Sequence, residues 1–155
     1  MINDKIKKGN QMNRRKALKI AGVAALMTTI NAQAKMAVAN MNRMIMKAKD
    51  PKKMEKGELK HTPLITIKEK DTKGYTLVEI TIGQGGIVHP STPDHWIDFI
   101  SLHADDKLIG KNILEPEVSR GATSFYVKLD GIKMLKATSG CNLHGIWSST
   151  IPATV

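Results

Sequence analysis

The chain has 155 residues and a mass of 17.0 kDa, which is enough for one domain and a tail but not for two ordinary domains. Its net charge of +10 comes mostly from residues 1–34, where seven basic residues and one acid contribute +6. The remaining 17 basic and 13 acidic residues leave +4, and only two Phe, two Tyr and two Trp are present to stack on bases. This distribution argues against a nucleic-acid-binding protein.

The N-terminal segment, residues 1–34, has the three parts of a secretory signal peptide. A basic start that includes Arg14 and Arg15 precedes an apolar run over residues 20–30 and a small-residue cleavage site ending at Ala34. The apolar run is about half of the roughly 20 residues that a membrane-spanning helix needs, so a membrane anchor is the weaker alternative. Because the paired arginines resemble the twin-arginine type of bacterial export signal, we predict export of a folded protein to the periplasm by that machinery.

Residues 35–57 are rich in methionine and lysine and are predicted to form a linker. Asp50 and Pro51 would end any helix that begins within it. Methionine thioethers can bind copper outside the cytoplasm. Methionine is also a common gap-filling residue, so a flexible linker or a loosely packed helix is the favoured interpretation.

From residue 58 to residue 155 the pattern is that of β-strands. Short runs rich in β-branched residues, separated by Gly, Asp or Pro, predict strands over 62–68, 75–82, 96–103, 107–114, 122–129 and 133–138. Asp130 and Gly131 predict a tight hairpin between the last two of these strands. With no credible helix among them, these strands predict an all-β sandwich or barrel.

The only cysteine, Cys141, is followed three residues later by His144. A tight turn would bring this thiolate and imidazole to the same side, where both can reach one metal ion. Three further histidines, His61, His89 and His95, stand in loop-like contexts upstream. A single cysteine cannot form an internal disulfide, and an unpaired thiol in an exported protein needs an explanation, of which metal ligation is one.

Four imidazoles and one thiolate favour iron among the common metals. Structural zinc is usually four-coordinate and has more sulfur ligands, and blue copper uses two histidines and one cysteine. Five ligands on an ion that prefers octahedral geometry leave one position open for a small substrate. The fifth histidine, His103, fits none of these ligand contexts and is predicted to be an ordinary strand residue.

The order and spacing of these residues closely resemble the superoxide reductase family, which includes neelaredoxin and desulfoferrodoxin. The resemblance covers about residues 58–150 and is carried by Lys60-His61-Thr62-Pro63, His89-Pro90-Ser91-Thr92-Pro93-Asp94-His95-Trp96-Ile97, Ser124-Phe125-Tyr126-Val127-Lys128-Leu129 and Cys141-Asn142-Leu143-His144-Gly145-Ile146-Trp147. It implies an immunoglobulin-like β-sandwich or barrel with one iron per chain. Four histidine nitrogens would be equatorial ligands and the cysteine sulfur the axial ligand. Because the two-iron members add a four-cysteine domain, the chain resembles the single-iron class.

The resemblance also implies the reaction. Ferrous iron would donate one electron to superoxide, hydrogen peroxide would leave, and a rubredoxin-like or cytochrome-like donor protein would reduce the iron again. Lys60 matches the family's lysine beside the first ligand and would attract superoxide and assist protonation. The family's glutamate, two residues before that ligand, is replaced here by Leu59. Glu58 lies one residue earlier and, in a strand, would face away from the iron.

Two other functions remain open from the residues alone. One is an exported electron-transfer or copper-binding β-sandwich without enzymatic activity, and the other is a structural β-module with buried histidines. About one iron per chain, against copper, would separate the first of these from a superoxide reductase. The sequence leaves the electron donor, a homo-oligomer and a membrane-tethered form undecided.

Overall fold

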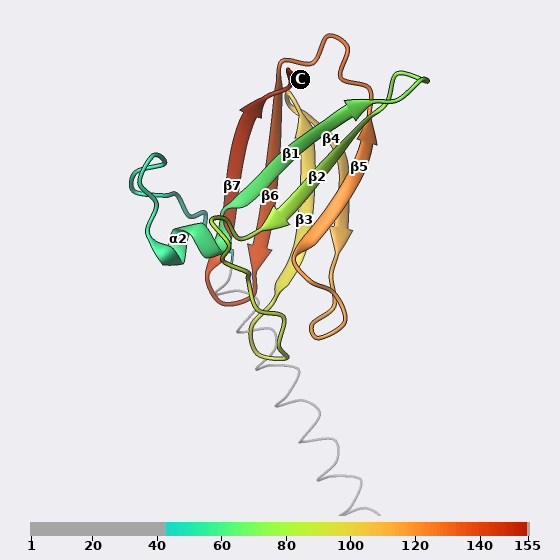
Figure 1. Cartoon of the computed structure of the whole chain (residues 1–155). Coiled ribbons are helices and arrows are strands. Elements are labelled where there is room, and N and C mark those ends of the chain that lie inside the picture. The colour runs from blue at the N-terminus through green and yellow to red at the C-terminus, as the bar shows by residue number, and fades with distance from the viewer. Residues whose placement is uncertain (1–42, 155) are drawn as a thin grey trace, which may run out of the picture. The chain divides into compact units, whose positions relative to one another are not determined.

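The computed structural model describes residues 43–154, so the predicted signal segment and the first part of the predicted linker lie outside the described residues (Figure 1). A short helix, α2 (Lys56–His61), precedes strands β1 (Pro63–Lys70), β2 (Thr76–Ile82), β3 (Ile97–Ala104), β4 (Lys107–Ile113), β5 (Ala122–Val127), β6 (Met134–Cys141) and β7 (Gly145–Pro152). Over residues 43–154, no helix has both the length and the apolar character that crossing a membrane requires.

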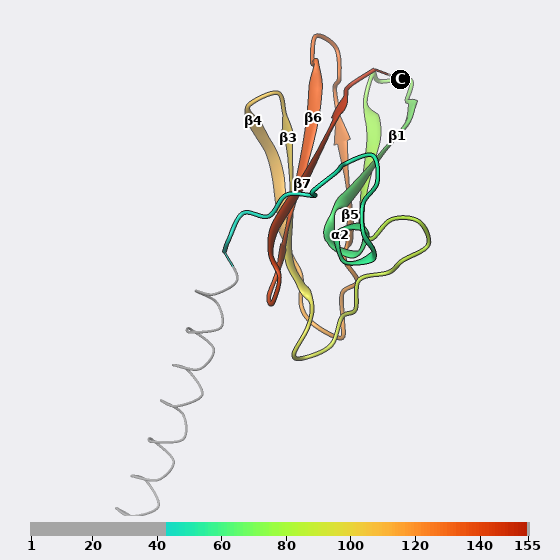
Figure 2. The same cartoon turned by 90° about the vertical axis from the view of Figure 1, so that its left-hand side faces the viewer.

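The strands form two antiparallel sheets that face each other (Figures 1 and 2). One sheet has the order β1-β2-β5, and the other has the order β4-β3-β6-β7. The predicted all-β sandwich is therefore confirmed. The six predicted strands correspond to β1 through β6 within a few residues at each end.

Alternation along the strands builds the core between the sheets and also places the cysteine. In β6 the buried side chains are Leu135, Ala137, Ser139 and Cys141, at every second position from the strand start. Successive side chains of a strand point to opposite faces, so this period of two is what a half-buried sheet requires. Cys141 is thus the last inward-facing residue of β6 and lies at one end of the sandwich.

Two elements were not predicted. Strand β7 begins at Gly145 and forms the edge of the larger sheet, with a mixed pattern of buried and exposed positions. Helix α2 begins with a capping box, in which Glu55 and Glu58 each accept a backbone N–H of the other. This helix precedes the first strand, so the expectation that no helix lies among the strands is confirmed for the described residues.

The prediction of a hairpin at Asp130 and Gly131 is wrong. The turn itself is present, since the N–H of Ile132 donates to the carbonyl of Leu129 at 3.0 Å and Gly131 has a φ of 81°. The flanking strands, however, do not pair with each other: β5 pairs with β2, and β6 pairs with β3 and β7. A turn sequence fixes the local backbone but not the sheet that receives the next strand, and here the chain crosses from one sheet to the other.

Candidate metal centre

The structure brings all five predicted ligand residues to one end of the sandwich. His61 is the last residue of α2, and His89 and His95 lie in the loop between β2 and β3. Cys141 ends β6, and His144 lies in the turn that leads into β7. His103, by contrast, lies within β3 and takes no part in the cluster, as predicted.

The ligand-type atoms of these residues converge. One potential ligand atom from each of His61, His89, His95 and Cys141 lies within 4.8 Å of the others. The Nδ1 atom of His144 lies 3.1 Å from Nε2 of His61, 3.1 Å from Nε2 of His95 and 3.5 Å from the cysteine sulfur. With metal–nitrogen bonds of about 2.1 Å, neighbouring ligands at right angles would be about 3 Å apart. The observed nitrogen separations match that spacing.

Hydrogen bonding does not satisfy these atoms by itself. Nε2 of His89 is buried and has no hydrogen-bond partner within the described residues. Nδ1 of His144 faces three potential acceptors but carries at most one proton. A buried polar atom without a partner is costly, and a cation shared by all the ring nitrogens would satisfy them together. The donor set therefore fits a bound metal ion.

The imidazoles of His61, His89 and His95 are held in the neutral form that metal binding requires. Burial lowers the pKa of His61 to about 4 and that of His89 to about 3, from an ordinary value near 6.5. Burial also lowers the pKa of His95. At neutral pH these three rings are accordingly uncharged.

Backbone carbonyls fix which nitrogen faces the cluster. Nδ1 of His61 donates to the carbonyl of Gly57 at 2.6 Å, and Nδ1 of His89 donates to the carbonyl of Pro90 at 2.7 Å. Each bond orients the ring and leaves Nε2 free to bind a metal. His144 is turned the other way and presents Nδ1.

The thiol of Cys141 is fully buried and lies near two backbone N–H groups. Burial raises its pKa, while the backbone N–H groups of Leu143 and His144 act in the opposite direction. A nearby metal cation would release the proton and bind the thiolate. The two N–H groups would then stabilise the sulfur's negative charge.

Asn142 joins the cysteine turn to the histidine loop. Its side-chain carbonyl accepts the N–H of Trp96 at 2.8 Å, and its amide donates to the carbonyl of Asp94 at 2.8 Å. Its own N–H donates to the carbonyl of Trp96 at 3.0 Å. His95 lies between Asp94 and Trp96 in the chain. The three hydrogen bonds thus fix its position relative to Cys141.

Trp147 and Ser139 fix the other side of the cluster. The indole of Trp147 stacks on His61, with ring centroids 5.5 Å apart and planes 18° apart, and its N–H donates to the carbonyl of His144 at 2.8 Å. The buried hydroxyl of Ser139 donates to the carbonyl of His61 at 3.2 Å. These contacts connect the helix that carries one ligand to the turn that carries another.

Lys60 is half-buried and lines the same cavity as His61 and His144. Its charge contributes to the lowered pKa values of His61, His89 and His95, so the ammonium group acts on the same space as the ring nitrogens. A fixed positive charge at this place would attract a small anion.

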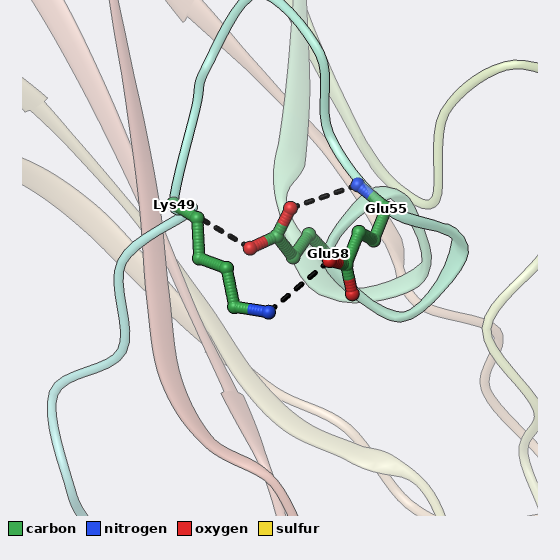
Figure 3. A network of polar contacts seen from close by, with 3 residues as sticks. All are labelled: Lys49, Glu55 and Glu58. Atoms are coloured by element: carbon green, nitrogen blue, oxygen red, sulfur yellow. Dashed lines mark hydrogen bonds and ion pairs between the residues drawn. The ribbon is translucent and has the colours of Figure 1, made fainter.

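Glu58 is not among the residues whose ligand atoms converge, and its carboxylate accepts hydrogen bonds from two backbone N–H groups (Figure 3). One oxygen of its carboxylate accepts the N–H of Lys49 at 2.8 Å, and the other accepts the N–H of Glu55 at 2.8 Å. The expectation that Glu58 is not directed at the metal ligands therefore holds. The reason differs from the expected one, because Glu58 lies in a helix and not in a strand. The Glu-x-x-Glu spacing of a capping box is the sequence signal that indicates this arrangement.

Comparison with known proteins places the whole cluster within one family. The family model described as Desulfoferrodoxin matches residues 52–150. A desulfoferrodoxin from Nitratidesulfovibrio vulgaris is 37% identical over 90 residues, which cover 58% of this chain and 61% of that protein. A superoxide reductase from Thermococcus kodakarensis is 36% identical over 107 residues, which cover 62% of this chain and 88% of that protein.

Solved structures agree with the sequence relatives. A single-iron superoxide reductase from Giardia intestinalis superposes with a TM-score of 0.52 at 27% identity, covering 60% of this chain and 97% of that one. A superoxide reductase from Nanoarchaeum equitans superposes with a TM-score of 0.55 at 25% identity, covering 70% of this chain and 99% of that one. The two-sheet domain thus corresponds to nearly the entire length of both proteins.

The first prediction concerns Asn142. Replacing it with Ala leaves the N–H of Trp96 without its acceptor, which costs about 1–3 kcal/mol of stability. Loss of such an orienting contact lowers metal affinity by about 10- to 100-fold. Chelator competition for ferrous iron measures the affinity, and Asn112→Ala on the exposed face of β4 is the matched control. Equal affinities for the two variants would contradict the orienting role.

The second prediction concerns Glu58. Its two N–H donors, from Lys49 and then Glu55, lower the pKa of the carboxyl. The stabilisation it provides is therefore present at neutral pH and is lost as the pH falls through the folded-state pKa. We expect Glu58→Ala to lower the Tm at neutral pH and to leave the absorption spectrum of the oxidised, iron-loaded protein unchanged. Glu69→Ala, in an exposed part of β1, is the control, and a spectral change specific to Glu58→Ala would indicate a metal ligand instead.

Proposed function

Because the chain belongs to the desulfoferrodoxin family, we propose that it is a superoxide reductase, which converts superoxide to hydrogen peroxide at one mononuclear, non-haem iron. The observation that carries this proposal is the convergence of four imidazoles and the only cysteine at one end of the sandwich. His61, His89, His95 and His144 would supply four nitrogens, and the cysteine would supply one sulfur.

The net reaction adds one electron and two protons to superoxide and yields hydrogen peroxide. Iron, when bound, supplies the electron. The chain's own residues hold the site in the required state: burial keeps the imidazoles of His61 and His89 neutral, and carbonyls orient them. The N–H groups of Leu143 and His144 stabilise the negative charge on the sulfur of Cys141.

Lys60 is the residue that we assign to the substrate. Its ammonium group acts on the space around the histidine cluster and would draw the superoxide anion toward it. The same charge would favour negative charge developing on oxygen as the electron arrives, and would hold a water molecule that donates a proton. Glu58 stays bound to backbone N–H groups and does not compete for the site.

The reaction requires a reductant, because each turnover removes one electron from the iron. His144 is the most exposed member of the cluster and offers a short path from the protein surface to the metal. We assign the donor role to a small electron-transfer protein of the rubredoxin or cytochrome type. The sequence of residues 1–34 supports a periplasmic location for this exchange.

The third prediction tests the reaction with the full chain, loaded with ferrous iron and exposed to pulses of superoxide. We expect about one hydrogen peroxide per iron and no dioxygen, and loss of the reaction in Cys141→Ser. His103→Gln, a histidine outside the cluster, should retain the yield. Dioxygen release would indicate dismutation instead, and no reaction together with tight copper binding would support the copper-binding alternative.

The fourth prediction concerns export. Replacing Arg14 and Arg15 together with Lys keeps the charge but removes the arginine pair on which recognition by twin-arginine machinery would depend. We expect the variant to accumulate in the cytoplasm, where cell fractionation and immunoblotting detect it, while Lys7→Arg and Lys8→Arg together leave export unchanged. Unaltered periplasmic accumulation of the arginine variant would rule out this route.

A further inference from the structure

A segment that precedes the family match lies against the candidate metal centre. Residues 43–49 come before residue 52, where the match to the desulfoferrodoxin family begins. Ile45 forms an isolated parallel bridge with Ile146, which lies at the start of β7. The N–H of Met46 donates to the carbonyl of Ile146, and the N–H of Ile146 donates to the carbonyl of Met44, both at 2.8 Å. We call residues 43–49 the wall segment.

The wall segment is fixed at both ends as well as at its centre. At one end the guanidinium of Arg43 pairs with the carboxylate of Asp98 in β3. At the other end the N–H of Lys49 donates to Glu58 in helix α2 (Figure 3). In the middle, the absence of a side chain at Gly145 makes room, since a Cβ there would lie 2.5 Å from the carbonyl oxygen of Met44. The wall segment is therefore part of the folded domain.

A cavity of about 640 Å³ opens between the wall segment and the metal centre. We call it the access cavity. Met44, Met46 and Lys47 line it on one side, and Lys60, His61 and His144 line it on the other. A cavity of this size admits molecules far larger than a diatomic anion, so shape alone cannot select superoxide. Selection must come from the charges on its lining.

Some charged groups on the cavity lining have a partner, and others do not. Lys49 forms an ion pair with Glu55 at 3.1 Å, and the carboxylate of Glu58 is occupied by two backbone N–H groups. Lys47 forms no ion pair with any residue in the described range 43–154, and neither does Lys60. The lining thus presents two free ammonium groups, one from the wall segment and one from helix α2.

The apolar part of the lining strengthens the effect of these charges. Met44, Met46, Leu143 and Trp147 contribute the apolar surface of the cavity. Field lines from a charge concentrate in a cleft with low-dielectric walls, and such clefts raise association rates of opposite charges by about 10- to 1,000-fold in favourable cases. A small anion that enters the cavity would be attracted by both ammonium groups.

We propose that the access cavity is a binding site for small monovalent anions and that Lys47 is a specificity-determining residue, which guides superoxide past the wall segment toward Lys60. This inference rests on the proposed function for its natural substrate. The anion site itself requires only the cavity and its two free ammonium groups. Lys47 does not contact the metal ligands in this role, and it acts on the approach of the anion.

The test compares Lys47→Glu with Lys53→Glu in the full, iron-loaded chain. Both substitutions change the net charge equally, and Lys53 is exposed but does not line the cavity. We expect Lys47→Glu to lower the second-order rate constant for superoxide, measured by pulse radiolysis, by about tenfold at 0.01 M ionic strength. We expect Lys53→Glu to lower it by less than about twofold, and the difference to vanish at 1 M salt, where screening reduces the Debye length to about 3 Å.

A second readout does not depend on turnover. Azide, a three-atom monovalent anion, is titrated into the oxidised, iron-loaded protein and its Kd is followed by absorption. We expect Lys47→Glu to raise the Kd by about the same factor as it lowers the superoxide rate constant, and Lys47→Arg to restore both values. If Lys47→Glu and Lys53→Glu behave alike in both measurements, Lys47 has no such role. If azide binding depends on Lys47 but wild type does not reduce superoxide, the proposed function fails and the anion site stands.

Discussion

The structure depends on the close approach of imidazole nitrogens around one point at the end of a β-sandwich. Nδ1 of His144 lies 3.1 Å from two other ring nitrogens, and a fourth, on His89, is buried with no hydrogen-bond partner among residues 43–154. Protonated rings would repel one another at such distances, and neutral rings cannot all be satisfied by hydrogen bonds. A shared metal cation would bind the unprotonated nitrogens of all the rings and so remove both the repulsion and the unsatisfied polar atoms. We therefore interpret the fold around the cluster as the structure that holds these rings in place.

Much of the surrounding polar structure serves that purpose. Asn142 connects the cysteine turn to the histidine loop, and Trp147 connects the same turn to the helix that ends at His61. The sandwich supplies a rigid base, because Cys141 is the last inward position of a central strand paired on both sides. The ligands thus come from a helix end, a loop, a strand end and a turn, and hydrogen bonds between these elements determine their relative positions.

The sequence was most informative where the chemistry is local. Alternating β-branched residues located six of the strands, and the Cys-x-x-His spacing located the turn at residues 141–144. The edge strand β7 was missed because its Ser- and Thr-rich stretch after Trp147 lacks clear apolar alternation. The crossing from β5 to β6 depends on long-range pairing, which the turn residues at 130 and 131 do not encode.

Long-range contacts also account for what the sequence left open near the site. The position of Glu58 depends on a helix and on backbone groups of Lys49 and Glu55, and only the fold brings these together. The packing of Met44 and Met46 against β7 likewise depends on tertiary contact and on the missing side chain at Gly145. A methionine-rich composition by itself is equally compatible with a linker.

X-ray absorption at the iron edge, recorded on the full chain loaded with one equivalent of iron, would test the metal centre most decisively. We predict a shell of four nitrogen scatterers and one sulfur scatterer. The sulfur should lie at about 2.3 Å, a distance typical of metal–thiolate bonds. The sulfur contribution should disappear in Cys141→Ser while the nitrogen shell remains. A shell of nitrogen and oxygen alone in the wild-type protein would contradict the assignment of Cys141 and the histidines to a single iron site.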